Sequence, residues 1–434
     1  MSKSEIAIPP RQVTESRDTI RPVDALGRRI VLERLQGLCH GLLQVNDSTG
    51  THTFGNRNDE LTVSINVPNS RFYGAIAFGG AVGAAEAYIQ GYWNCSDLTN
   101  AIRLLVRNRE VLDAMDSGAA RVSAPLRKLV HYFNRNTKDG SRKNIAAHYD
   151  LGNEFFSLWL DDTMMYSSAI FEHPEMTLKE ASEAKLNRIC RKLELSPDDH
   201  VLEIGTGWGG FAMYAAQNFG CQITTTTISR EQFEFAKSRI MEAGLDDRVE
   251  LLLTDYRELE GRYDKIVSIE MIEAVGHEYM ATYFEKCASL LKDDGMMCLQ
   301  TITIADQRYA AALKSVDFIQ RYIFPGGFLP SVTAMLDSLT RSTDMRLIHL
   351  EDIGPHYAET LKRWREAFSQ NLDRVWSLGF REEFVRMWHY YYCYCEGAFR
   401  ERAIGDVQAV FVKPGARREP VLGCLDNSSF TCRE

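Results

Sequence analysis

The sequence of 434 residues lacks several features that would place it in a narrow class of protein. Its ten cysteines are scattered without a CxxC pair, and its histidines form no cluster at zinc-ligand spacing, so reduced thiols in a cytoplasm are expected. The net charge of -9, from 50 basic and 59 acidic residues, argues against a general nucleic-acid binder. There are no internal repeats or low-complexity tracts.

The sequence also lacks a long hydrophobic run. The N-terminal residues MSKSEIAIPPRQ have no apolar core segment of the kind found in signal peptides. The most apolar window, residues 73–89, contains Glu86 and four glycines and is shorter than the ~20 residues that span a bilayer. These features predict a soluble protein, at most peripheral to a membrane and then on its inner face.

A glycine-rich motif stands near the middle of the chain, in the stretch VLEIGTGWGG at residues 201–210. Its first residues are β-formers in an apolar run and predict a buried strand, and the residues after Gly210 look helical. Gly205, Gly207 and Gly210 form G-x-G-x-x-G at the turn between the two. Such a turn lets a ligand approach the backbone closely and offers it unpaired N–H groups of the helix N-terminus.

The motif alone does not separate dinucleotides from other nucleotide-like ligands. Glu203 stands at the tip of the first strand, where a carboxylate can hold a cationic ligand group. The second strand, 222–227, ends in threonines, whereas a dinucleotide site usually has an acid there, ~20 residues on, to bind the ribose. This pattern favours S-adenosylmethionine over NAD.

Strands and helices alternate from this motif onward, which predicts an α/β fold with a doubly wound parallel sheet. The expected strands are 201–205, 222–227, 249–253, 264–269, 295–302, 345–350 and 406–413. Ahead of them, an amphipathic helix from Arg28 to about Val45 is expected to open a small α+β module. The expected boundaries are a flexible lead 1–24, the N-terminal module 25–118, a basic linker 119–146, the main domain 147–415 with a lid insertion 306–331, and a tail 416–434.

The linker carries seven basic residues against one acid, with apolar residues interleaved. They are Arg121, Arg127, Lys128, Arg135, Lys138, Arg142 and Lys143. A basic amphipathic surface in an acidic protein suits anionic lipid headgroups, at ~1 kcal/mol for each basic side chain near the surface. An ordinary solvated linker helix explains the same residues equally well.

Several stretches, in this order along the chain, resemble the cyclopropane-fatty-acyl-phospholipid synthase family, which includes the mycolic acid cyclopropane synthases. They are GAVGAAEAYIQGYWNCSDL, HYDLGNEFFSLWLDDTMMYSSAIF, VLEIGTGWGGFA, TTTTISREQ, DYRELEGRYDKIVSIEMIEAVG, RYIFPGGFLPS, HYAETLKRW and EGAFRERAIGDVQAVF. The resemblance covers roughly residues 30 to 415. It implies a Rossmann-like methyltransferase sheet of seven strands, the last antiparallel, and an N-terminal lipid-facing domain.

The resemblance also implies the residues that bind S-adenosylmethionine. Tyr166 and Ser167 would close over its methionine end, and the residues after strand 2 would meet the ribose. Asp255 and Tyr256 would flank the adenine. The full expected set is Tyr166, Ser167, Glu203, Gly205, Gly207, Trp208, Thr227, Ile228, Gln232, Asp255 and Tyr256. An ordinary helix N-cap at Thr227 or Ser229 is compatible with this role.

The implied reaction is methyl transfer to an acyl double bond, followed by removal of a proton that closes a cyclopropane ring. Glu273, Tyr357 and Ile302 match the family's active-site carboxylate, tyrosine and backbone contact, where a bicarbonate ion serves as base. Three positions depart from the family: Ser168 replaces a cysteine, Ala274 replaces a histidine, and Gln300 replaces another histidine. Ser168 and Gln300 can still hydrogen-bond an anion, but neither carries positive charge at neutral pH, which argues against bicarbonate binding and leaves ring closure open.

We therefore expect a methyltransferase acting on unsaturated acyl chains of membrane phospholipids. Cyclopropane chains are the first expectation for the product, and methylene- or methyl-branched chains the second. A non-catalytic lipid-binding protein with this fold is the alternative from another class, although the intact glycine motif argues against it. A methyltransferase for a small soluble acceptor would leave the N-terminal module and the insertion unexplained. The expected partner is a phospholipid surface, and the sequence is compatible with a homodimer.

Overall fold

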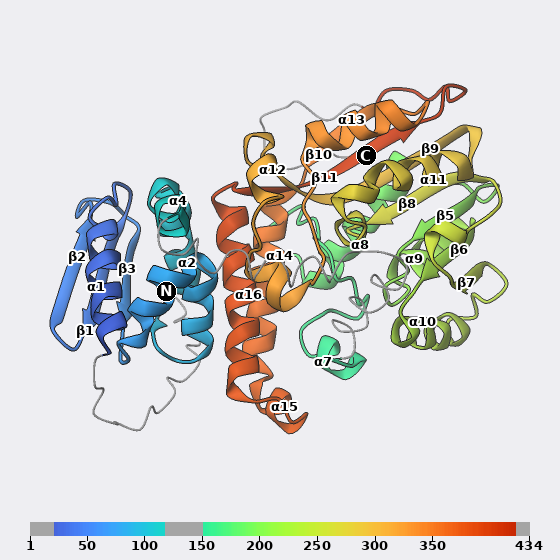
Figure 1. Ribbon diagram of the computed structural model, residues 1–434. Coiled ribbons are helices and arrows are strands. Elements are labelled where there is room, and N and C mark those ends of the chain that lie inside the picture. The colour runs from blue at the N-terminus through green and yellow to red at the C-terminus, as the bar shows by residue number, and fades with distance from the viewer. Residues whose placement is uncertain (1–20, 118–150, 422–434) are drawn as a thin grey trace. The chain divides into compact units, whose positions relative to one another are not determined.

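The computed structural model describes residues 21–117 and 151–421, with the side chains of 114–117 excluded (Figure 1). The chain forms two compact units. Among the described residues, the first unit contains 21–117, 314–325 and 361–403, and the second contains 151–313, 326–360 and 404–421. The sequence-based boundaries, which treated 147–415 as one domain, did not anticipate that two later segments join the N-terminal module.

The second unit is built on a seven-stranded sheet. Its order is β10-β11-β9-β8-β5-β6-β7, and β11 runs antiparallel to both β9 and β10, while β5 to β9 pair in parallel. The strands are β5 His200–Ile204, β6 Gln222–Thr227, β7 Val249–Leu253, β8 Tyr263–Ile269, β9 Leu291–Ile304, β10 Arg346–Asp352 and β11 Ile404–Val412. The predicted α/β fold with a Rossmann-like sheet and an antiparallel last strand is confirmed.

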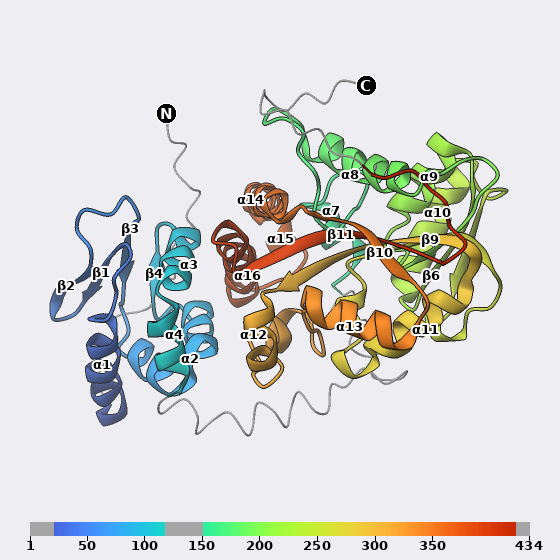
Figure 2. The same ribbon diagram turned by 90° about the horizontal axis from the view of Figure 1, so that it is seen from above.

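Helices cover both faces of this sheet (Figure 2). Alternate residues of β9 enter opposite cores: Met296 and Cys298 pack on one face, and Met297 and Leu299 on the other. The helices of the first face are α8 Leu178–Lys192, α9 Gly210–Phe219 and α10 Arg230–Glu242, and those of the second are α11 Met280–Leu290 and α13 Val332–Ser342. Shorter elements are α7 Asn153–Ser157, η2 Tyr256–Glu258, η3 Ile272–Ala274, η4 His277–Tyr279 and α12 Asp306–Ala312.

The first unit combines a four-stranded sheet, of order β2-β1-β3-β4, with helices. Its strands are β1 Leu42–Asp47, β2 Gly50–Gly55, β3 Thr62–Asn66 and β4 Asn94–Cys95. Its helices are α1 Pro22–Leu35, α2 Arg71–Ile89, α3 Leu98–Arg107, α4 Arg109–Ser117, the π-helix η5 Ile319–Ile323, α15 Leu372–Ser377 and α16 Glu382–Arg400. Helix α14, Gly354–Gln370, begins in the second unit and ends in the first.

The predicted helix from Arg28 to Val45 is wrong in its second half. Helix α1 ends at Leu35, and Val45 lies in strand β1. A continuous helix to Val45 is excluded at Gly41, because its φ of 80° is outside the helical region and an added Cβ would meet Leu104 at 2.9 Å. The helix also starts earlier than expected, inside the stretch 1–24 that was predicted to be a flexible lead.

Helix α2 contains most of the apolar window. Among the described residues it is the one helix long and apolar enough to cross a membrane by length and composition, and 67% of its most apolar stretch is buried within the protein. Gly80, with φ 60° and ψ -143°, interrupts it. Burial of this kind is typical of the core helix of a folded unit.

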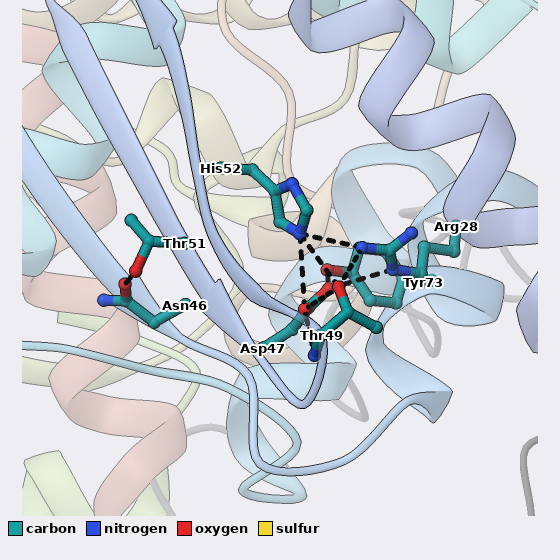
Figure 3. Close-up of polar contacts among 7 residues, drawn as sticks. All are labelled: Arg28, Asn46, Asp47, Thr49, Thr51, His52 and Tyr73. Carbon is teal, nitrogen blue, oxygen red and sulfur yellow. Dashed lines mark hydrogen bonds and ion pairs between the residues drawn. The ribbon is translucent and has the colours of Figure 1, made fainter.

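A polar cluster around Asp47 joins three elements of the first unit (Figure 3). The Asp47 carboxylate accepts hydrogen bonds from Arg28 Nε of α1 at 2.9 Å, from Tyr73 Oη of α2 at 2.5 Å, and from the backbone and side chain of Thr49. His52 Nε2 lies 3.4 Å from the same carboxylate. We call this the Asp47 cluster, and it fixes the β1–β2 turn against both helices.

Two sequence predictions remain untested by the structure. The basic residues between Arg121 and Lys143 lie outside the described part of the chain. The insertion 306–331 divides between the units: α12 belongs to the second, and residues 314–325 belong to the first. There Tyr322 Oη donates to Glu86 Oε1 of α2 at 2.7 Å. A lid role for this insertion stays a prediction.

Candidate active site at the carboxyl ends of the strands

The turn after β5 brings the glycine motif to the carboxyl edge of the sheet. Gly205 and Gly207 have φ values of 105° and 53°, in the region that favours glycine. Nothing lies within 4 Å of a Cβ built at Gly207, so a ligand has open space against this backbone. Trp208 is buried, and its Nε1 donates to Asn153 Oδ1 at 2.6 Å.

Glu203 lies one residue before the end of β5 and is 2% exposed. Its carboxylate accepts a hydrogen bond from Thr225 Oγ1 of β6 at 2.6 Å. Burial raises the pKa of Glu203 to about 8, although this hydrogen bond and the charge of Lys185 oppose the shift. The predicted carboxylate is therefore in place at the strand tip, and its role toward a cationic ligand stays a prediction.

The start of α10 follows β6 and contains the predicted ribose-side residues. Ser229 caps the helix by accepting from Gln232 N at 3.3 Å, as the N-cap interpretation required. Thr227 Oγ1 donates to Gln232 Oε1 at 2.8 Å, and both residues are buried. Ile228, between Thr227 and Ser229, is partly exposed. These contacts hold Gln232 in one orientation at the carboxyl edge.

Asp255 and Tyr256 follow β7 at the same edge of the sheet. Both oxygens of Asp255 pair with Arg257, at 2.8 Å to Nε and 2.7 Å to Nη2. The Tyr256 ring packs edge-on against Tyr283 of α11 at 5.5 Å. The predicted adenine contacts therefore involve an acid that already holds an arginine, and a tyrosine with a packed ring.

The segment 166–168 approaches the same edge from outside the sheet. The Tyr166 ring packs against Phe156 and Trp159, at centroid distances of 5.7 and 5.2 Å. Ser167 is buried, and its Oγ accepts a hydrogen bond from Lys185 Nζ of α8 at 2.7 Å. The sequence predicted the two residues of this segment that would face the cofactor but not the lysine behind them.

Glu273 lies in η3, directly after β8. Its Oε1 accepts from Thr301 Oγ1 at 2.7 Å and from the Ile302 backbone N–H at 2.6 Å, so the predicted Ile302 contact is made to a side chain of the protein itself. Its Oε2 is buried and has no hydrogen-bond partner among the described residues. Burial and the nearby charge of Glu270 raise the pKa of Glu273 to about 8.

A second glutamate, Glu270, collects the remaining donors. Its Oε1 accepts from the Ser168 backbone N–H and from Gln300 Nε2, each at 2.8 Å, and its Oε2 accepts from Tyr357 Oη at 2.6 Å. Gln408 Nε2 donates to Gln300 Oε1 at 3.0 Å, which turns the Gln300 amino group toward Glu270. Three of the predicted residues therefore converge on an acid that was not predicted.

Asp406 of β11 and Lys185 complete what we call the Glu270 cluster. Asp406 lies opposite Ile302 in the strand register, and its Oδ2 is 3.4 Å from Gln300 Nε2. Burial and the charges of Glu270 and Glu273 raise the pKa of Asp406 well above its ordinary value. Burial lowers the pKa of Lys185 to about 8, and the surrounding carboxylates oppose that shift. One buried ammonium group thus faces several buried acids.

Comparison with known proteins agrees with this geometry. Residues 136–409 match the family described as mycolic acid cyclopropane synthetase. The chain belongs to this family. It is therefore an S-adenosylmethionine-dependent methyltransferase of the cyclopropane synthase type, and the non-catalytic alternative gains no support.

Individual members of the family resemble the chain over most of its length. The tuberculostearic acid methyltransferase UfaA1 of Mycobacterium tuberculosis is 38% identical over 347 residues, or 77% of this chain and 80% of that protein. The cyclopropane-fatty-acyl-phospholipid synthase of Escherichia coli K12 is 36% identical over 361 residues, or 82% and 89%. The solved structure of mycolic acid cyclopropane synthase CmaA1, complexed with SAH and CTAB, is 32% identical with a TM-score of 0.59, covering 63% of this chain and 98% of that one.

The residues present fit S-adenosylmethionine, because open space adjoins the Gly207 backbone and the polar side chains of Glu203 and Gln232 stand at the same edge of the sheet. They do not fit bicarbonate. The Ile302 N–H donates to Glu273, and the Ser168 N–H, Gln300 Nε2 and Tyr357 Oη all donate to Glu270. The donors at the place where the family resemblance puts an added anion are thus occupied by carboxylates of the chain, and a further anion would be repelled by their charge.

Sequence reasoning missed Glu270, Asp406 and Lys185, although each leaves a signal. Glu270 directly follows an apolar strand at its carboxyl end, where open α/β sheets bind ligands. Asp406 is an acid within a strand that is otherwise mostly apolar. Lys185 stands on the buried face of α8, four residues after Ala181 and four before Ile189. A charged residue at a core position of this kind indicates a functional site.

Proposed function

We propose that this enzyme transfers the methyl group of S-adenosylmethionine to the double bond of unsaturated acyl chains in membrane phospholipids and closes a cyclopropane ring. One observation carries the proposal: the cofactor turn and the buried acids adjoin. Met271, between Glu270 and Glu273, lies 3.2 Å from a Cβ built at Gly205. A reacting group held at the glycine turn would therefore lie beside carboxylates in a water-poor site.

The proposed chemistry explains why buried carboxylates are needed. An alkene is a weak nucleophile, so the site must hold it in line with the sulfonium methyl group. Transfer breaks the S–CH₃ bond, uses the alkene electron pair to form a C–C bond, and leaves a cation on the acyl chain. Carboxylates in a dry site stabilise that cation without adding water to it, and a base then removes a proton from the new methyl group.

Methylene-branched chains are the second candidate product. In that case the cation migrates by a hydride shift before the proton leaves, and a methyl branch would further require a reductant. A specific observation favours this candidate, because the relative UfaA1 is named a tuberculostearic acid methyltransferase rather than a cyclopropane synthase. The two products have the same mass, so they must be distinguished by structure.

We also propose that the protein docks on the bilayer surface peripherally, since its substrate lies there. Neutralising Arg127, Lys128, Arg135 and Lys138 together should weaken cosedimentation with anionic vesicles if the basic segment contributes. Undiminished binding would exclude that segment as the contact. A homodimer is a separate proposal, which the mass measured by light scattering would test.

The function is tested with purified protein, S-adenosylmethionine labelled in its methyl group, and vesicles of an unsaturated phospholipid. Lipid mass spectrometry should show the gain of one CH₂ unit in the acyl chain. Proton NMR then separates a cyclopropane, with its high-field ring protons, from a methylene branch, with its vinyl protons. Vesicles of the saturated phospholipid are the control and should gain no label.

A negative result is informative only if the cofactor binds. Calorimetric titration with S-adenosylhomocysteine should establish that under the assay conditions. Unlabelled lipid in the presence of bound cofactor would overturn the phospholipid proposal and leave the family assignment intact. Label in free fatty acids but not in phospholipids would correct the substrate class.

A further inference from the structure

Glu270 is the most unusual residue of the second unit, because its backbone is strained. Its φ is 48°, in the left-handed region that residues with a Cβ rarely adopt. The residue is partly buried, and its carboxylate accepts three hydrogen bonds of 2.6 to 2.8 Å. Strain of this kind persists where the surroundings enforce it, and it is concentrated at functional sites.

The three hydrogen-bond donors around Glu270 indicate which group its carboxylate replaces. The family resemblance places bicarbonate beside Tyr357, and Ser168 and Gln300 stand where the family has a cysteine and a histidine. Bicarbonate is a planar anion with three oxygens on one carbon. The Glu270 carboxylate has the same planar shape and the same charge. It meets these donors through its own Oε1 and Oε2, so the anion is supplied by the chain.

We propose that Glu270 replaces bicarbonate as the base of the reaction, so that this enzyme works without an added anion. The inference rests on the proposed function. In the step concerned, the Glu270 carboxylate takes a proton from the methyl group newly bound to the acyl cation. The electron pair of that C–H bond forms the ring bond, or the double bond of a methylene branch, and the proton stays on Glu270.

The surrounding groups keep Glu270 in the form a base requires. Its donors stabilise a negative charge, whereas Asp406 has one oxygen, Oδ1, without a partner among the described residues. Gln300 Nε2 lies 2.8 Å from Glu270 Oε1 but 3.4 Å from Asp406 Oδ2, so this donor favours negative charge on Glu270 over negative charge on Asp406. Lys185 supplies a compensating positive charge nearby.

Two substitutions at Glu270 test the assignment in opposite ways. Glu270→Gln keeps the size of the side chain but removes its charge, and it should lower lipid modification on the order of 10²–10⁴-fold, with no recovery on adding bicarbonate. Glu270→Gly removes the carboxylate and relieves the positive φ. It should be inactive in CO₂-free buffer and regain activity when bicarbonate is added. Glu285→Gln, an exposed glutamate of α11, is the matched control and should behave as the wild type.

A binding measurement makes the test independent of turnover. Carbon-13 NMR of labelled bicarbonate should show no binding to the wild-type protein and binding to Glu270→Gly. Affinity for S-adenosylhomocysteine, measured by calorimetry, should be unchanged in both variants and shows that they are folded. Wild-type activity should be the same with and without bicarbonate.

The outcomes separate this inference from the proposed function. A wild-type enzyme that modifies phospholipid only when bicarbonate is present would overturn the role of Glu270 alone. So would a Glu270→Gln variant with wild-type turnover. A wild-type enzyme that binds cofactor and modifies no phospholipid under either condition would instead overturn the proposed function.

Discussion

The Asp47 cluster and the Glu270 cluster both gather titratable side chains, one in each unit, but they differ in how completely their polar atoms are satisfied. Both Asp47 oxygens accept hydrogen bonds, and the net pKa of Asp47 lies below its ordinary value because these bonds outweigh burial (Figure 3). In the Glu270 cluster and the adjoining Glu273, both oxygens of Glu270 accept hydrogen bonds, but Asp406 Oδ1 and Glu273 Oε2 are buried without described partners, and the pKa values of Asp406 and Glu273 are raised.

This difference separates a structural cluster from a functional one. A buried carboxylate whose donors are all present stabilises the fold, because its charge is compensated where it lies. A buried carboxylate that lacks partners costs free energy in the folded state, and such a cost is retained where a ligand or a reaction uses the group. The contrast can be tested by changing one acid or base at a time.

The largest effect is expected at Glu273. Glu273→Gln should lower lipid methylation on the order of 10²–10⁴-fold, since an amide cannot carry negative charge opposite the acyl cation. The measurement is initial rates with labelled S-adenosylmethionine and unsaturated phospholipid vesicles. Cofactor affinity should be nearly unchanged, because Glu273 bonds to Thr301 and Ile302 rather than to the glycine turn. Normal turnover in this variant would remove Glu273 from the mechanism.

Lys185 should have the next largest effect, on stability. Lys185→Met removes the buried ammonium group that faces Glu270 and Asp406, leaving acids without their counter-charge. We expect the free energy of unfolding of the second unit to fall by about 3 kcal/mol, measured by urea denaturation. Lys179→Met on the same helix, where the side chain is half exposed, should change it by less than about 0.5 kcal/mol. Equal effects of the two substitutions would show that Lys185 is not a counter-charge.

Lys185 also shows how far sequence reasoning reached. The seven strands of the second unit were predictable because buried parallel strands give short apolar runs, punctuated by glycine and by helical periods. The end of α1 was not, because the apolar spacing of residues 28–45 continues past Leu35 into β1 without marking the residue at which the helix ends. The contribution of segments 314–325 and 361–403 to the first unit depends on tertiary contacts, which no local pattern contains.

For the site, the sequence indicated residues that stand within recognisable motifs and missed those that act by proximity. Tyr357 and Gln300 were identified, but the acid they bind was not, because the three lie far apart in the chain. Glu270 can be recognised as a candidate functional residue only when its positive φ and its three hydrogen-bond donors are known. The positive charge of Lys185 on α8 balances the acids that follow β8 and lie in β11, and these groups come together only in the folded unit.

A smaller effect is expected in the Asp47 cluster. Asp47→Asn removes the charge that Arg28 and Tyr73 donate to, and it should lower the free energy of unfolding of the first unit by about 2 kcal/mol without a direct effect on methyl transfer. Hydrogen exchange of peptides from α1 and α2 would locate the loss. Asn46→Ser on the neighbouring residue of β1, whose side-chain hydrogen bonds to Ser64, Asn66 and Thr51 lie mostly at the surface, should have a much smaller effect. A loss of methyl transfer at full stability would mean that this cluster is functional after all.

The sharpest contrast is the opposite response of the two clusters to pH. The pKa of Glu273 is about 8 in the folded state, compared with an ordinary value of 4.5. Glu273 therefore destabilises the fold progressively as the pH rises from 4.5 to about 8. The slope is on the order of 1 kcal/mol per pH unit, and Glu273→Gln should remove this part of it in urea denaturation at a series of pH values. Asp47 has a lowered pKa, so its contribution is present above its ordinary value of 3.8 and is lost as pH falls toward its folded value. The advantage of the wild type over Asp47→Asn should therefore shrink in acid, while the advantage of Glu273→Gln over the wild type should grow in base. Parallel pH profiles for the two variants would mean that the clusters are not different in kind.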